Sequence, residues 1–379
     1  MRAIFAVPLT LGLVYRAHSH KSLTPFGIVV AALTATVHAI HPWNLPFVLL
    51  IVFFLAGTRA TAVKKEVKAS LTLSAQGSSG GEGPRTHVQV LANSLVASIL
   101  SLLHTYQLSQ RRQAGANGET TACYSWKGDL LVVGIIANYA AVCADTFSSE
   151  LGILSRTEPR LITSLSLRKV PRGTNGGVTV WGLVAGLLGS MIIVATSMIS
   201  LPLCGDHISA EGAGGGGQPW SLNEKLIFAG GMTILGALGS LLDSFLGGWL
   251  QRSVRDVRTG KIVEGEGGVR VLASGNAPEI NQSADLKARL VNGEGANAIE
   301  NTSSAVDESN SVTPARYDPK NKHRKPSFGD NMPTRVVETG WDLLDNNEVN
   351  LLMAFSMSVI GMVVASWCWD VPIASIFEA

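Results

Sequence analysis

Long apolar runs separated by polar loops dominate the chain. The pattern predicts eight membrane-spanning helices, near residues 3–16, 23–41, 44–57, 88–106, 129–144, 178–201, 226–249 and 350–369. A span needs about 20 mostly apolar residues to cross a hydrocarbon core of roughly 30 Å, and the first and third runs are shorter. Shorter helices can still cross where the bilayer thins. We therefore expect an all-α, polytopic integral membrane helix bundle of about eight spans.

Composition supports the membrane class. Hydrophobic residues make up 46% of the 379 residues and charged residues only 15%, which is unusual for a water-soluble multidomain enzyme. The first apolar run also fits a signal peptide, but no small-residue cleavage pattern precedes Arg16 and the next run follows at once. A signal anchor or first span is the favoured interpretation. The four cysteines have no metal-site spacing and leave the redox compartment open.

The basic residues lie unevenly on the two sides of the predicted bundle. With eight spans, the loops at 17–22, 58–87, 145–177 and 250–349 share one face, which holds 25 of the 30 Lys and Arg residues. When the 13 basic residues of the long last loop are left out, this face still has 12 Lys and Arg residues and the other face has five. The positive-inside rule then places this face in the cytosol and both termini on the outer or lumenal side.

Composition also divides the chain into three parts. Residues 1–258 form the predicted membrane bundle, with a glycine-rich, basic cytosolic loop at 145–177. Residues 259–334 are rich in Gly, Ser, Asn, Glu and Lys, and such a segment buries too little apolar area to offset its chain entropy, so we expect a long disordered cytosolic loop. Residues 335–379 hold a final cytosolic motif and the last span. Shorter flexible loops are expected at 73–84 and 211–218.

Two acids lie within or beside apolar runs. Asp243 lies inside the run 226–249, where an ionised carboxylate costs at least about 2.5 kcal/mol unless it faces protein or water. Asp145 follows the run 129–144, at the same side of the membrane. Small or polar residues share a helical face with each acid, namely Gly236, Ser240 and Gly247 with Asp243, and Asn138 with Asp145. These faces predict close helix packing, and the alternative to a site is interhelical hydrogen bonding without chemistry.

The loop before the sixth predicted span combines glycine with positive charge. Gly173, Thr174, Asn175, Gly176 and Gly177 precede that span directly, so their backbone N–H groups and the helix N-terminus could bind an anion. The loop also carries Arg156, Arg160, Arg168, Lys169 and Arg172. The chain has no GxxxxGK[ST] motif, which excludes a P-loop NTPase. Carboxylates at Asp145, Glu150 and Asp243 could hold Mg²⁺, or the acids and bases could simply pair with one another.

Several motifs resemble the core of the transmembrane protein 19 family, also called domain of unknown function 92. They span nearly the whole chain and include Ala144-Asp145-Thr146-Phe147-Ser148-Ser149-Glu150, Val170 to Thr179, Arg85 to Asn93, Gly239 to Ser244 and Asn346 to Asn350. The family usually has Gly before the Asp-Thr pair and Trp-Ala after it, where this chain has Ala144, Phe147 and Ser148. The resemblance implies a multi-helix membrane fold. One plant branch of this family contains the phytyl-phosphate kinase of tocopherol synthesis.

This resemblance leads to a hypothesis of phosphoryl transfer from a nucleoside triphosphate to an isoprenyl monophosphate. The donor would be CTP, because the plant kinase resembles CTP-dependent polyprenol kinases. Residues 173–177 with Lys169 and Arg172 would bind the donor phosphates, Asp145, Glu150 and Asp243 would hold Mg²⁺, and Arg156 and Arg160 would receive the acceptor phosphate. The prenyl tail would lie among the small-residue faces of spans five to seven. The alternative is a multi-pass transporter, or a non-catalytic membrane protein that binds anionic lipid or a partner. We expect membrane lipid but no nucleic acid as a partner, and a eukaryotic endomembrane such as the endoplasmic reticulum as the location.

Overall fold

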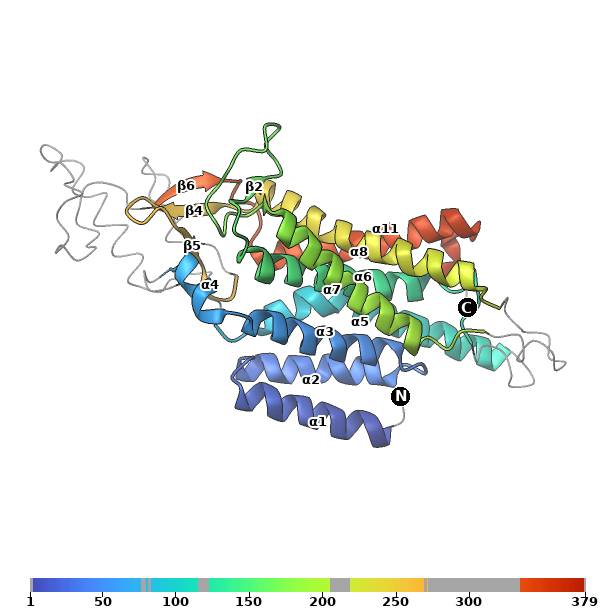
Figure 1. The fold of residues 1–379 in the computed structure, drawn as a ribbon. Helices are drawn as coiled ribbons and strands as arrows, with labels where there is room; N and C mark the ends of the chain where they lie inside the picture. Colours follow the sequence, from blue (N-terminus) through green and yellow to red (C-terminus); the bar gives the residue numbers. More distant parts are fainter. Residues whose placement is uncertain are drawn as a thin grey trace, which may run out of the picture.

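The fold is a bundle of long helices (Figure 1). The computed structural model describes residues 3–75, 80, 83–114, 123–204, 219–268, 271 and 335–377. Eight of its helices correspond to the eight predicted apolar runs: α1 (Ala3–Ser19), α2 (Pro25–Ile40), α3 (Leu45–Ala62), α5 (His87–Ala114), α6 (Leu130–Gly152), α7 (Val180–Ser200), α8 (Leu222–Leu250) and α11 (Asn346–Trp369). Six are long and apolar enough to cross a membrane, while α1 and α2 have 17 and 16 residues. The predicted membrane bundle is confirmed.

Helix α6 lies at the centre of the bundle. Its residues from Leu130 to Ala144 are all buried, and α3, α5, α7, α8 and α11 pack around it. Small residues make this packing close, because a Cβ added at Gly189 of α7 would lie 2.6 Å from the Cys143 carbonyl oxygen. A Cβ at Gly236 of α8 would lie 2.7 Å from the Cβ of Ala140. The predicted small-residue faces therefore pack helix against helix at these positions.

Short strands and a short helix gather at one end of the bundle, and both chain termini lie at the other (Figure 1). The four-stranded sheet has the order β1 (Leu73–Ser74), β5 (Ile262–Glu264), β4 (Ser253–Asp256) and β6 (Arg335–Thr339), with β1 parallel to β5 and the other pairs antiparallel. Beside it lie the antiparallel pair β2 (Arg160–Leu161) and β3 (Gly177–Val178), helix α4 (Lys65–Leu71) and the turn η1 (Glu266–Gly268). We call this the basic end, since the loops predicted to be cytosolic meet here.

The sheet corrects two predicted loops. Strand β1 falls in the segment 73–84, and strand β5 falls in the segment 259–334, so neither segment is irregular throughout. Pairing with neighbours far away in sequence gives these short strands their order, since β5 lies between β1 and β4. Residues 272–334, which make up most of the predicted insert, lie outside the described residues, as does the expected loop at 211–218.

The opposite end is fixed by a disulfide and by a buried polar cluster, and η3 (Ile373–Ile376) ends the described chain nearby. Cys123 pairs with Cys204, which the spacing of the cysteines did not predict. Asp129 accepts a hydrogen bond at 3.1 Å from His104 and pairs with Arg111 at 2.6 Å. Burial alone would raise the pKa of Asp129, but these two partners outweigh burial and lower it. A disulfide is typical of an oxidising compartment, which agrees with the predicted topology.

Candidate functional site

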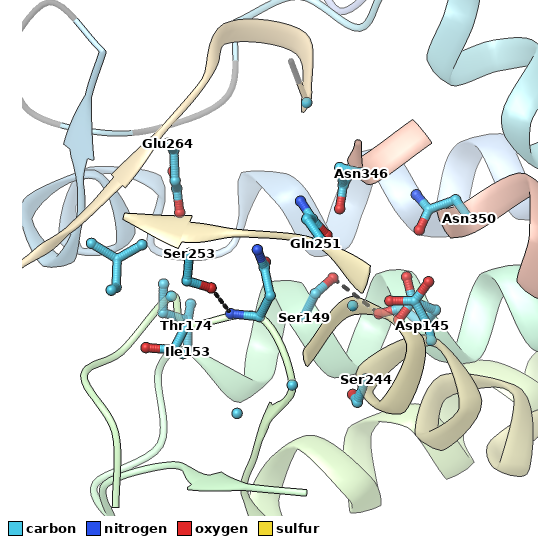
Figure 2. A pocket seen from close by; sticks show the side chains of 18 of the residues that line it. Asp145, Ser149, Ile153, Thr174, Ser244, Gln251, Ser253, Glu264, Asn346 and Asn350 are labelled. Carbon is cyan, nitrogen blue, oxygen red and sulfur yellow. Dashed lines mark hydrogen bonds between the residues drawn. The ribbon is translucent and has the colours of Figure 1, made fainter. Parts of the chain in front are cut away.

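A cavity of about 320 Å³ opens at the basic end of the bundle. Its wall is built from the ends of α6 and α8, the start of α11, the loop 173–179 and strands β4 and β5. Figure 2 shows side chains from all of these elements turned toward one space, with Asp145 on α6, Ser253 and Glu264 on the strands and Asn346 and Asn350 on α11. The size is at the low end of the range for small-molecule sites, roughly 300–1,000 Å³.

The two acids predicted from the apolar runs meet in this cavity. Asp145 and Asp243 both line the cavity, and their carboxyl groups are close enough to interact. Two carboxylates in contact repel each other when both are charged, so they require either a shared proton or a cation. The Oδ1 atom of Asp243 is buried and has no hydrogen-bond partner among the described residues. The pair is therefore suited to holding a cation, because buried polar atoms without a protein partner need another one.

Carboxamides from other helices complete the wall around this pair. Asn93 of α5 and Asn346 and Asn350 of α11 line the cavity, and within the part of the chain that the structure describes, the buried Oδ1 of Asn350 also has no hydrogen-bond partner. A capping box between Asp345 and Glu348 begins α11 here and fixes the direction in which its first turn enters the site. Carboxylate and carboxamide oxygens are ligands that Mg²⁺ accepts alongside water and phosphate. These residues thus fit the predicted ion.

The predicted third acid is bound elsewhere. Glu150 lies at the cavity wall, but its carboxylate forms an ion pair with Lys68 of α4 and accepts a hydrogen bond at 2.7 Å from Thr61 of α3. Among the described residues, no three His, Cys, Asp or Glu side chains gather as one metal site. The structure thus brings Asp145 and Asp243 together and gives Glu150 a different role. It anchors α4 to the central helix.

The glycine-rich loop lines the cavity, as predicted, but much of its backbone is already hydrogen-bonded. The N–H of Thr174 donates to Pro171, that of Asn175 to the Ser253 hydroxyl at 2.9 Å, and that of Gly177 to Thr174. Gly176 has φ +78° and packs on Gly248 of α8. The glycines are therefore explained first by close packing, and the loop offers an anion fewer free N–H groups than predicted.

The predicted basic residues lie outside the cavity wall. Lys169 pairs with Glu158 at 2.9 Å, and this contact lowers the pKa of the exposed Glu158 carboxyl. Arg160 donates to the carbonyl of Leu167, while Arg156 and Arg172 are not buried. The predicted topology alone is enough to explain positive charge on this loop, so that charge is not by itself a signal for a phosphate site.

Arg85 supplies positive charge inside the cavity and was not predicted. It precedes α5 and lines the wall together with Arg252, which pairs with Asp342 at 3.4 Å. No described carboxylate forms an ion pair with Arg85, whose guanidinium donates to the Thr61 hydroxyl at 3.0 Å. The family motifs contained the signal for the missed residues, since Arg85, Asn346 and Asn350 all lie within them.

Comparison with known proteins places this site in a family context. The family described as "Integral membrane protein DUF92" matches residues 8–358. "Protein PGR" of Arabidopsis thaliana is 32% identical over 259 residues, which are 66% of this chain and 80% of that protein. "Uncharacterized membrane protein MJ0933" of Methanocaldococcus jannaschii is 30% identical over 205 residues, 54% of this chain and 65% of that protein.

A further plant relative and the solved structures complete the comparison. "Protein VTE6, chloroplastic" of Arabidopsis thaliana is 29% identical over 173 residues, 46% of each chain. No solved structure matches the chain. Relatives from plants and an archaeon, one of them chloroplastic by name, do not favour the endoplasmic reticulum over other membranes.

Proposed function

Because the chain belongs to the integral membrane protein DUF92 family, we propose that it transfers a phosphoryl group from a nucleoside triphosphate to an isoprenyl monophosphate at the membrane surface. The reaction class is taken from a resemblance: the motifs resemble a family in which one plant branch contains a phytyl-phosphate kinase. The observation that carries the proposal is the meeting of Asp145 and Asp243 in one cavity at the basic end, where a buried oxygen of Asp243 has no hydrogen-bond partner among the described residues.

The proposed reaction does not need a strong general base. A phosphate oxygen of the acceptor attacks the terminal phosphorus of the donor, and the bond from that phosphorus to the bridging oxygen breaks. The fully ionised reactants and products carry the same total charge, so no proton has to be removed. The site must instead align two anions and offset their repulsion. Acids that share a cavity with an arginine lacking a carboxylate partner among the described residues suit that task, because the acids can hold a cation while Arg85 attracts phosphate.

Asp145 and Asp243, with the carboxamide oxygen of Asn350, would hold Mg²⁺ in this proposal. When bound, the ion would neutralise charge on the donor phosphates. The loop 173–177 faces the same cavity and would border the donor, with CTP as the nucleotide suggested by analogy. Ser253, hydrogen-bonded to the N–H of Asn175, fixes that loop against strand β4.

The test uses the full chain in lipid nanodiscs. It is incubated with phytyl or farnesyl phosphate, Mg²⁺ and each nucleoside triphosphate in turn, and diphosphate product is measured. The Asp145→Asn variant should lower the transfer rate by about 100-fold or more, since it removes a charge that acts on the reacting phosphates. Glu158→Gln is the matched control, because this exposed acid lies at the same end but outside the cavity wall.

Two results would contradict the proposal. One is an Asp145→Asn variant that transfers the phosphoryl group at the wild-type rate, which would show that the acid pair takes no part in the reaction. The other is the absence of product with every nucleotide while the substrate moves across liposomes that contain the protein, which would favour the transporter.

A further inference from the structure

A second, smaller cavity of about 90 Å³ lies between α1, α2, α3 and α5. Its wall is mostly aliphatic and aromatic, with side chains such as Leu13, Val14, Ala31, Leu50, Phe53 and Phe54. Arg85 and Asn93 line this cavity and also the larger polar one. The apolar cavity and the polar cavity therefore meet at these two side chains.

Arg85 is held firmly at this junction. Its backbone N–H donates to the Ser22 carbonyl at 3.0 Å, and its own carbonyl accepts from Thr24 N–H at 3.0 Å. The turn between α1 and α2 is thus tied to the start of α5. The guanidinium donates to the Thr61 hydroxyl of α3, and Arg85 lines both cavities. An arginine with no carboxylate partner among the described residues is suited to a phosphate.

We propose that the hydrocarbon chain of the acceptor enters the apolar cavity between α1, α2, α3 and α5, and that Arg85 binds its phosphate. The inference rests on the proposed function and names where its lipid substrate lies. A single-chain amphiphile fits this arrangement, because its apolar and anionic parts would each meet matching chemistry on either side of Arg85. This replaces two expectations from the sequence, a tail among α6, α7 and α8 and an acceptor phosphate on Arg156 and Arg160.

The size of the cavity limits what it holds. It is smaller than the roughly 150 Å³ cavity that accommodates a benzene-sized molecule, so it takes only the first carbons beside the phosphate. The remainder of the chain would lie along α1, whose outward apolar side chains are exposed, including Ile4 at 73% and Leu11 at 62%. The site thus selects a head group and the start of a chain, while longer chains continue into the bilayer.

The experiment measures binding without turnover. Full-length protein in nanodiscs, with no nucleotide present, is irradiated with a farnesyl phosphate analogue that carries a photoreactive diazirine near the phosphate, and labelled peptides are mapped by mass spectrometry. Labels are expected on α1, α2 or α3, with competition by farnesyl phosphate at concentrations at least tenfold below those needed for farnesol. Labels on α7 and α8, or equal competition by phosphatidic acid, would overturn the assignment.

Matched variants separate the two halves of the proposal. Ala31→Trp fills the cavity and should lower labelling at least tenfold, whereas Leu33→Trp, on the same helix but 62% exposed and outside the wall, should not. Arg85→Gln should weaken farnesyl phosphate binding about 10- to 100-fold but leave farnesol binding unchanged. The control is Arg59→Gln, an exposed arginine outside both cavities.

The outcomes also distinguish this inference from the proposed function. If labelling maps as expected and no diphosphate forms with any nucleotide, the lipid site stands and phosphoryl transfer is wrong. If diphosphate forms and Ala31→Trp labels as well as wild type, transfer stands and the placement of the chain is wrong.

Discussion

Replacing Gly176 with Ala tests whether the glycine-rich loop is shaped by its packing on α8. Gly176 has φ +78°, and a Cβ there would lie 2.6 Å from the Cα of Gly248 and 2.9 Å from the carbonyl oxygen of Ser244. Both contacts are with helix backbone, which cannot rotate out of the way as a side chain could. Either the loop or the end of α8 would have to move.

Two terms set the magnitude. The left-handed conformation costs a non-glycine residue about 1–2 kcal/mol, and overpacking against fixed atoms costs typically about 1–3 kcal/mol. We expect Gly176→Ala to destabilise the fold by about 2–5 kcal/mol. Gly260→Ala is the control, since Gly260 has φ +71° with nothing within 4 Å of its Cβ position and should show the conformational term alone.

The assay compares thermal unfolding of the two variants in detergent, followed by phosphoryl transfer in nanodiscs. Ser244 directly follows Asp243, so a shift of α8 that relieves the clash would also disturb the acid pair. Gly176→Ala should therefore unfold at a lower temperature than Gly260→Ala and lose more transfer activity. Equal stability and activity in both variants would refute the packing argument. Anion binding would then again be the better explanation of the glycines in this loop.

Three further predictions concern the ends of the bundle. Glu150→Gln and Lys68→Met should each lower the free energy of unfolding by about 3–5 kcal/mol, because each leaves one partner of the ion pair buried alone. The double variant should lose less than the sum of the two. Additive losses would show that the two residues are not coupled. Asp129 has a lowered pKa in the fold, so its contribution is present above its unfolded pKa and is lost as pH falls below about 4; an Asp129→Asn variant should lose that part of the pH dependence in thermal unfolding. Cys123 and Cys204 should resist a membrane-impermeant thiol reagent until a reductant is added, with the exposed free cysteine of α11 as positive control; direct labelling of either would contradict the disulfide.

The helices could be predicted from the sequence, whereas the strands could not. Each span is a run of 14 or more mostly apolar residues, which gives a strong signal from local composition alone. Strand β1 has two residues and β5 has three, so neither shows an alternating pattern. They are ordered by partners far away, since Leu73 pairs with Val263. Their existence depends on tertiary contacts that local sequence does not encode.

The site was predicted in part, for a related reason. Asp145 and Asp243 attracted notice because carboxylates are costly in or beside an apolar helix. Arg85 and Asn346 lie in polar segments, where such residues are common and carry no anomaly. Arg156 and Arg160 show the reverse case: they attracted notice but lie outside the cavity wall, and positive charge in a loop predicted to be cytosolic is expected from topology alone. The energetic cost of a carboxylate in an apolar helix pointed to the acids, whereas the residues around them were marked only by the family motifs and were assigned to the site by the fold.

The two buried polar clusters of the bundle differ in a way that bears on function. At the end opposite the acids, Nδ1 of His104 contacts His41 at 2.8 Å while its other nitrogen and both oxygens of Asp129 are engaged within the cluster. A cluster completed by its own members needs no ligand. Toward the basic end, Asp243 has a buried oxygen with no partner among the described residues, as does Asn138 in the middle of α6. A bound cation or substrate would complete the contacts of Asp243, as the proposed phosphoryl transfer at the basic end requires.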